Sequence, residues 1–210
     1  MIPSQTALDR LREGNRRFAE DQPSETSLSG AVRRSQLLAG QQPFAIILGC
    51  SDSRVPAEIV FDQGLGDLFV IRVAGNIVAP SQIGSVEYAA EVTGARLVVV
   101  IGHSNCGAIQ ATINELQRPQ ANRSRNLSSI VNRIRPSVET LLETGLSQDR
   151  TALLRFAVRS NIRASVDHLR HGSEVLERLI DHDGLLVVGA EYSLETGLVE
   201  FFDGLPKMLE

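Results

Sequence analysis

The segment FAIILGCSDSR, residues 44–54, joins an uninterrupted apolar run to a group of chemically reactive side chains. A second segment, LVVVIGHSNCG at residues 97–107, has the same organisation. An uninterrupted apolar run of this length is typical of a strand that is buried on both faces, as the strands of a parallel sheet are. We therefore predict buried strands over residues 44–49 and 96–102, each followed by a polar loop.

The rest of the chain alternates apolar runs with helical patterns. Residues 68–72 and 184–190 indicate two further strands, and a hairpin around Thr196-Gly197 adds an antiparallel last strand. Residues 21–30 and 118–126 indicate loops. This alternation predicts an α/β fold, in which a mostly parallel central sheet with an antiparallel C-terminal edge strand is flanked by helices, beside an extended N-terminal helix. The predicted helices span residues 1–20, 32–38, 85–92, 108–116, 128–143, 151–170 and 174–180.

Length and composition narrow the class of protein. The chain has 210 residues, so we predict a single domain over residues 1–210 with an N-terminal helical arm over about 1–38. The net charge of -4 disfavours binding to nucleic acid or to an anionic membrane. No apolar run approaches the ~20 residues of a membrane-spanning helix, and the N-terminus lacks the pattern of a secretory signal. Two cysteines do not make a disulfide framework, which favours the cytoplasm.

The first predicted helix carries a mostly apolar stripe formed by Leu8, Leu11, Asn15 and Phe18. This helix lies well before the first strand, and the sequence offers the stripe no obvious place on its own sheet. We therefore expect the stripe to pack against a second subunit, in a homodimer or a higher even homo-oligomer.

The reactive side chains suggest a metal site. The two cysteines of the chain, Cys50 and Cys106, both come just after a predicted buried strand, and His103 directly follows the second of these strands. In open parallel sheets, ligands bind beyond the carboxyl ends of the strands, where these loops meet. Two thiolates, one imidazole and the carboxylate of Asp52 form a four-ligand set that suits zinc. Asp52 can also leave the metal, and a departing ligand opens a position for water.

Arg54 follows Asp52 at a spacing of two residues and admits two interpretations. In one, the two residues form a local ion pair that fixes a loop. In the other, Arg54 holds the carboxylate of Asp52 off the metal through a bidentate contact, and the pair acts as a switch. A single buried cysteine is usually a small apolar side chain, so the joint arrangement is far more specific than any one of its members.

The pattern Cys50-x-Asp52-x-Arg54 with His103-x-x-Cys106 resembles the signature of the β-class carbonic anhydrases. The neighbouring stretches match as well. They are GQxP at residues 40–43, FDQG at 61–64, GDLFV at 66–70, AGN at 74–76 and EYA at 87–89. The similarity runs from about residue 8 to residue 111 and is weaker from there to the C-terminus.

The resemblance implies a zinc enzyme that hydrates carbon dioxide reversibly to bicarbonate and a proton. It implies one zinc ion per subunit, held by Cys50, His103 and Cys106, and a hydroxide on zinc that is oriented by the dyad of Asp52 and Arg54. Asp52 is then also the alternative fourth ligand.

The resemblance also implies a substrate pocket for carbon dioxide and bicarbonate. Gln41, Phe69 and Tyr88 fall on positions that line this pocket in the plant-like members, some of them from the neighbouring subunit, and we add Val55. Another subgroup has a Trp at the position of Ile47, as part of a non-catalytic bicarbonate site, so no such regulatory site is expected here.

Three other functions compete with this interpretation. The same fold and zinc site can support a hydrolase for carbon disulfide or carbonyl sulfide, and pocket access would distinguish it. A non-catalytic zinc module, with Asp52 permanently on the metal, would bind zinc without turnover. A thiol redox protein is the third, although Cys50 and Cys106 lack the Cys-x-x-Cys spacing of a redox pair.

Overall fold

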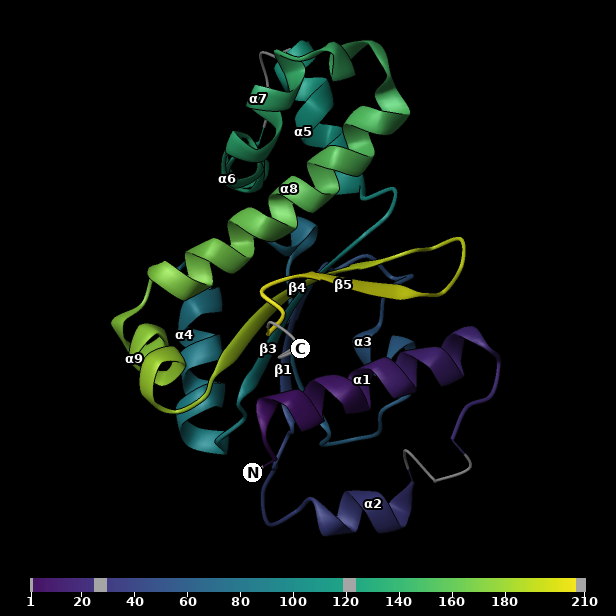
Figure 1. Ribbon diagram of the computed structural model, residues 1–210, viewed down its shortest axis with the longest axis vertical. Coiled ribbons are helices and arrows are strands. Elements are labelled where there is room, and N and C mark those ends of the chain that lie inside the picture. Colours follow the sequence, from purple (N-terminus) through teal and green to yellow (C-terminus); the bar gives the residue numbers. More distant parts are fainter. Residues whose placement is uncertain (1, 25–29, 119–123, 207–210) are drawn as a thin grey trace.

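The sheet has the predicted topology. The computed structural model describes residues 2–24, 30–118 and 124–206. Five strands lie in the order β2-β1-β3-β4-β5, with parallel neighbours except for the antiparallel pair β4 and β5 (Figure 1). This confirms the predicted α/β fold with an antiparallel C-terminal edge strand. The strands are β1 (Ala45–Gly49), β2 (Leu68–Arg72), β3 (Leu97–His103), β4 (Leu186–Tyr192) and β5 (Val199–Asp203).

Helices connect the strands and cover both faces of the sheet (Figure 1). The longest, α8, lies along β4 and β3 and extends beyond the sheet to α7. No helix of the described segments is both long and apolar enough to cross a membrane. The helices are α1 (Ser4–Ala19), α2 (Ala31–Gln36), α3 (Ala57–Val60), α4 (Pro80–Tyr88), α5 (Gly107–Gln117), α6 (Arg125–Ile134), α7 (Pro136–Leu142), α8 (Arg150–His171) and α9 (Glu174–His182). Short 3₁₀ turns form at Ala74–Asn76 and Gly145–Gln148, and a π turn at Ala89–Thr93.

Two helix predictions were wrong in their bounds because of prolines. The single helix expected over residues 128–143 is divided into α6 and α7, since Pro136 has no N–H for a continuous helix and instead begins a new one. Helix α4 begins at Pro80, five positions before the predicted start at residue 85, because proline is well suited to the first helical turn.

The short helix α3 was not predicted. Parts of both predicted loops, residues 25–29 and 119–123, lie outside the described residues.

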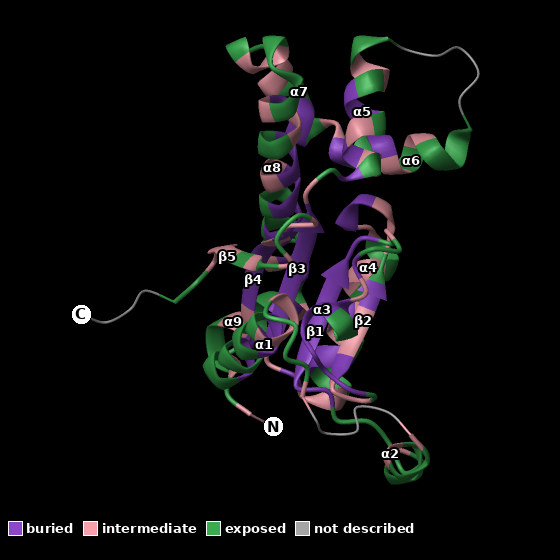
Figure 2. Ribbon diagram, turned by 90° about the vertical axis from the view of Figure 1, so that its right-hand side faces the viewer, coloured by how far each residue is buried: buried purple, intermediate pink, exposed green. Residues whose placement is uncertain are grey.

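The strands at the centre of the sheet are buried on both faces, as their apolar runs predict. Every residue of β1 and β3 is buried (Figure 2). Successive side chains of a strand point to opposite faces, so Ile46 and Leu48 enter one core while Ala45 and Ile47 enter the other. The first core is closed by α4, α5, α8 and α9, and the second by α1 and α3.

The apolar stripe of α1 packs on the sheet of its own chain. Leu8 and Leu11 are fully buried in the second core, and the ring of Phe18 lies 6.4 Å from that of Tyr192 at the end of β4. The expectation that this stripe covers a second subunit was therefore wrong. The stripe has no neighbour nearby in the sequence, because the strands beneath it come at least 26 positions after α1 along the chain.

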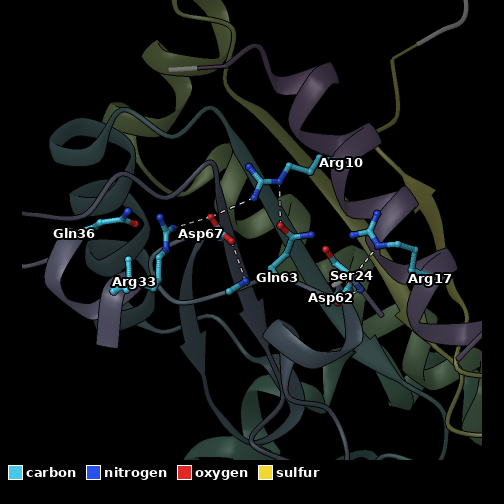
Figure 3. Close-up of a pocket in the computed structure, with 10 residues that line it drawn as sticks. Arg10, Arg17, Ser24, Arg33, Gln36, Asp62, Gln63 and Asp67 are labelled. Atoms are coloured by element: carbon cyan, nitrogen blue, oxygen red, sulfur yellow. Dashed lines mark hydrogen bonds and ion pairs between the residues drawn. The ribbon is translucent and has the colours of Figure 1, made fainter. Parts of the chain in front are cut away.

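Charged side chains attach the N-terminal helices to the segment before β2 (Figure 3). The guanidinium groups of Arg10 and Arg33 both lie 3.2 Å from Oδ1 of Asp67, and Arg17 pairs with the buried Asp62 at 2.5 Å. These side chains line a cavity of about 470 Å³. Asp67 directly precedes β2, so this cluster lies at the end of the sheet opposite to the loop that follows β1.

Asn15 is the polar member of the stripe, and it joins α1 to the end of α3 and to the hairpin between β4 and β5. The side chain of Asn15 is buried. Its Nδ2 donates to the carbonyls of Val60 (3.1 Å) and Gly197 (2.9 Å), and its Oδ1 accepts from the amide of Val199 (2.8 Å).

Asn15→Ala leaves these backbone groups without partners, so we expect the free energy of unfolding to fall by about 2–4 kcal/mol. Denaturant unfolding measures this loss. Gln5→Ala, on the exposed face of α1, is the control, and equal stability of the two variants would contradict the assignment.

Candidate metal centre

Three side chains converge at the carboxyl ends of β1 and β3. Cys50 directly follows β1, His103 is the last residue of β3, and Cys106 directly precedes α5. The two strands are parallel neighbours, with Gly49 beside Ile101, so the loops that follow them meet at one edge of the sheet. Sγ of Cys50, a ring nitrogen of His103 and Sγ of Cys106 all lie within 4.8 Å of one another, and all three residues are buried. The structure thus brings together three of the four predicted ligands.

The imidazole of His103 is oriented for a metal. Its Nδ1 lies 2.9 Å from the carbonyl oxygen of Ser104, which fixes the proton on Nδ1 because a carbonyl can only accept. Nε2 is buried, and no described group makes a hydrogen bond to it. A buried nitrogen lone pair without a partner, facing two sulfurs, fits a metal ion. Two thiolates and one imidazole are a donor set that zinc favours.

The two thiols differ in acidity because they share a hydrogen bond. The contact with Cys106 lowers the pKa of Cys50 to about 4, against the opposing effect of burial. The same contact, together with burial, raises the pKa of Cys106. Burial disfavours protonation of His103, but the neighbouring Cys50 thiolate raises its pKa overall. Protons therefore compete with a metal ion for all three ligands.

Asp52 lies beside the three ligands and is held by Arg54. The guanidinium donates from Nε to Oδ1 (2.9 Å) and from a terminal nitrogen to Oδ2 (2.8 Å), and the Arg54 amide also donates to Oδ1 (3.0 Å). These bonds, above all those of the side chain, hold the pKa of Asp52 well below its usual range. Oδ2 of Asp52 is 3.8 Å from Nε2 of His103, so a small movement of the side chain would bring the carboxylate into the ligand cluster.

The predicted pocket residues occupy three separate places. Val55 is buried next to the dyad, and its amide donates to the carbonyl of Asp52 (3.1 Å). Phe69 on β2 and Tyr88 on α4 form a ring pair with centroids 6.1 Å apart. Gln41 is exposed before β1. Within the described ranges, no hydrogen bond, ion pair or ring contact connects Gln41, Phe69 or Tyr88 to Asp52.

Three residues that were not predicted from the sequence support the ligand loops from behind. Arg72, the last residue of β2, donates to the carbonyls of Cys50 (3.0 Å) and Asp52 (2.6 Å). Asn161 and Ser165 of α8 bond to the carbonyls of the 74–76 turn. The signal for these two was present, since both are polar residues four positions apart within the buried face of an apolar helical pattern.

Comparisons with known proteins agree on one family. Residues 45–199 match the family model described as carbonic anhydrase. Carbonic anhydrase 2 of Mycobacterium tuberculosis is 40% identical over 190 residues, which cover 89% of this chain and 87% of that protein. The structure of the β-carbonic anhydrase CcaA is 28% identical with a TM-score of 0.73, covering 94% of this chain and 95% of that one. One of the tetrameric β-carbonic anhydrases of Sordaria macrospora shares the fold at 21% identity, with a TM-score of 0.71 and coverage of 94% and 97%.

Replacing one thiol ligand should abolish metal binding. We expect about one zinc ion per chain in the native protein and almost none in Cys106→Ser, because a serine hydroxyl does not ionise to match a thiolate ligand. In the native protein, zinc affinity should fall as the pH is lowered, since protons displace the metal from its ligands. Elemental analysis and chelator competition measure both effects. Ala111→Ser, on the exposed face of α5, is the matched control; zinc retained by Cys106→Ser would refute the ligand assignment.

Proposed function

The chain belongs to the β-class carbonic anhydrase family, and from this premise we propose the roles of its individual residues. Its activity is the reversible hydration of carbon dioxide to bicarbonate and a proton. The observation that carries this conclusion is the buried cluster of Cys50, His103 and Cys106, which suits one zinc ion per subunit, inside a segment that matches the carbonic anhydrase model. When bound, zinc supplies Lewis-acid chemistry, which makes a water molecule acidic enough to lose a proton near neutral pH.

Asp52 is proposed to orient the attacking oxygen. Its carboxylate stays ionised because Arg54 keeps its pKa low, so it can only accept hydrogen bonds. A carboxylate that accepts the remaining proton of the nucleophile leaves an oxygen lone pair free to attack carbon dioxide. Arg54 holds both carboxylate oxygens in one plane, which limits rotation of Asp52. If that pair breaks, Asp52 is close enough to become the fourth metal ligand, and this position closes the site.

A second copy of the chain is proposed to complete the substrate pocket. Tyr88 is 52% exposed and faces away from the buried core, although its ring pairs with Phe69. Phe69 lies three residues before the end of β2, about 10 Å along the strand from the edge that holds the ligands. Together with Gln41, this pair is available to another subunit, whose Val55 supplies the remaining apolar wall. The enzyme is then a homodimer or a higher even homo-oligomer, in line with the tetrameric relatives from Sordaria macrospora.

Two further proposals concern the chain as a whole. We propose a single domain over residues 1–210, which the burial of α1 against the central sheet supports. We also propose the cytoplasm as its location, because Cys50 and Cys106 are free thiols that must stay reduced to serve as ligands.

Breaking the ion pair of the dyad should reduce activity strongly. In Arg54→Leu, Asp52 loses the guanidinium that orients it, so we expect kcat/KM for carbon dioxide hydration to fall by at least about 100-fold. The pKa of Asp52 should also rise toward its usual value. Because the carboxylate acts only when ionised, the remaining activity of the variant should fall at acidic pH more steeply than that of the native enzyme.

Stopped-flow hydration assays between pH 5 and 9 measure the effect of Arg54→Leu, with Asp52→Ala alongside. The control is Arg178→Leu, which breaks an exposed ion pair between α9 and Glu91 in the Ala89–Thr93 turn. Rates for Arg54→Leu equal to those of this control would contradict the proposed role of the dyad. Bound zinc without any hydration by the native protein would contradict the catalytic role of the site.

Mixing two inactive variants tests whether Tyr88 acts in the neighbouring site. If it does, a mixed dimer of Asp52→Ala and Tyr88→Ala chains contains one site in which both residues are intact, and activity returns. If Tyr88 acts within its own chain, every site of the mixed dimer carries one substitution. We expect recovery of activity after the two variants are unfolded and refolded together, with each variant refolded alone as the control. Absence of recovery in verified mixed dimers would overturn the shared pocket.

A further inference from the structure

The turn that follows β2, at Ala74–Asn76, contacts the candidate metal centre through Cys50. The backbone amide of Gly75 lies 3.3 Å from Sγ of Cys50, and this contact is buried. An N–H group that donates to a ligand sulfur withdraws electron density from it and fixes its direction. Groups that contact a metal ligand in this way influence metal affinity although they never touch the metal.

The backbone of this turn is unusual and leaves little room for change. Gly75 has φ of +70°, and the next residue, Asn76, has φ of +43°, both in the left-handed region. A Cβ atom at Gly75 would lie 2.7 Å from Cδ1 of Ile134 and 3.1 Å from Cβ of Ala108. Glycine adopts this region freely, but Asn76 is held there at a cost in free energy unless its surroundings stabilise it. The amide that faces Cys50 therefore depends on outside support.

Helix α8 supplies that support. Nδ2 of Asn161 donates to the carbonyl of Gly75 (2.8 Å), and Oγ of Ser165 donates to the carbonyl of Asn76 (2.9 Å). Both side chains are at least 95% buried. They lie one helical turn apart and therefore share one face of α8. The other buried residues of this helix are mostly apolar: Leu153, Ala157, Val158, Ile162, Val166 and Leu169.

Two polar side chains in such a face are unfavourable unless each finds a partner. Here both partners are carbonyls of the same turn, so two successive peptide groups, Gly75–Asn76 and Asn76–Ile77, are each held by one side chain of α8. The other buried side chains of α8 are apolar and offer these two residues no hydrogen bond. A need to hold the Ala74–Asn76 turn in place explains why two polar residues occur on this face of α8.

We propose that Asn161 and Ser165 are positioning residues of the metal centre. They hold the Gly75 amide against the sulfur of Cys50, and in this way they set the strength of the bond between Cys50 and zinc. This inference rests on Cys50 as a metal ligand, and it assigns a function in the metal site to a helix that contributes no ligand.

Cadmium-113 in place of zinc tests the contact in the native protein. A hydrogen bond from an amide to a ligand sulfur transmits a scalar coupling from the metal nucleus to the amide proton. The Gly75 amide should show this coupling in ¹¹³Cd-loaded protein. A chain that binds no metal would contradict the proposed site as a whole, whereas bound cadmium without coupling to Gly75 would overturn only the present inference.

Substitution in α8 tests the support. In Asn161→Leu, which keeps the size of the side chain but removes its donor, zinc affinity should fall by about 10–100-fold. In the cobalt-substituted variant, the thiolate-to-cobalt charge-transfer band should move to longer wavelength, because the sulfur loses a hydrogen bond. The cadmium coupling at Gly75 should weaken as well. Ser165→Ala should change the same three quantities in the same direction, and it replaces Asn161→Leu if that variant does not fold.

The control is Leu169→Ala, a fully buried position of the same helix that contacts the core and not the turn. It should lower thermal stability and leave zinc affinity, the cobalt band and the cadmium coupling unchanged. If Asn161→Leu and Ser165→Ala resemble this control in all three quantities, the two residues are ordinary structural side chains and the proposal is wrong.

Discussion

The parallel pairing of β1 with β3 is the constraint on which the metal centre depends. Cys50 and His103 are 53 positions apart, and they meet because Gly49 and Ile101 are neighbours across two buried strands. A shift of one residue in this pairing would turn the side chains of either strand to the opposite face. The apolar residues that fill both cores therefore also fix the distance between the ligands. Packing in the sheet and chemistry at its edge are set by the same register.

Around this edge, the chain places groups that each control one property of the site. The carbonyl of Ser104 selects the nitrogen that His103 presents, and Arg54 selects the position and the charge of Asp52. Arg72 holds the loop between Cys50 and Asp52 through its carbonyls. The three candidate ligands are buried whereas the side chain of Arg54 is half-exposed, so the ion pair of Asp52 and Arg54 lies between the buried cluster and solvent.

Local sequence patterns predicted the parts of the molecule that depend on local properties. The strands were found because runs such as residues 44–49 are apolar without interruption, and the ligands because reactive side chains follow these runs. Features that depend on distant partners were not found. The stripe of α1 was assigned to a second subunit because its own strands come later in the chain. Asn161 stands out as a polar residue within an apolar helical face, but its function could not be predicted, because its partner is the carbonyl of a turn 86 positions away.

The side chain of Asn15 has a consequence for the order in which the molecule can fold. It connects the first helix with residues 45, 182 and 184 positions further along the chain. Contacts that close such long loops form late, since the entropy of closure must be overcome before they contribute. During synthesis, α1 leaves the ribosome before the sheet does, and its hydrogen-bonding partners at the β4–β5 hairpin follow 182 and 184 positions later. Asn15 therefore gains these partners only after β1, β3 and β4, on which the apolar stripe packs, have been synthesised, so this end of α1 is secured late in folding.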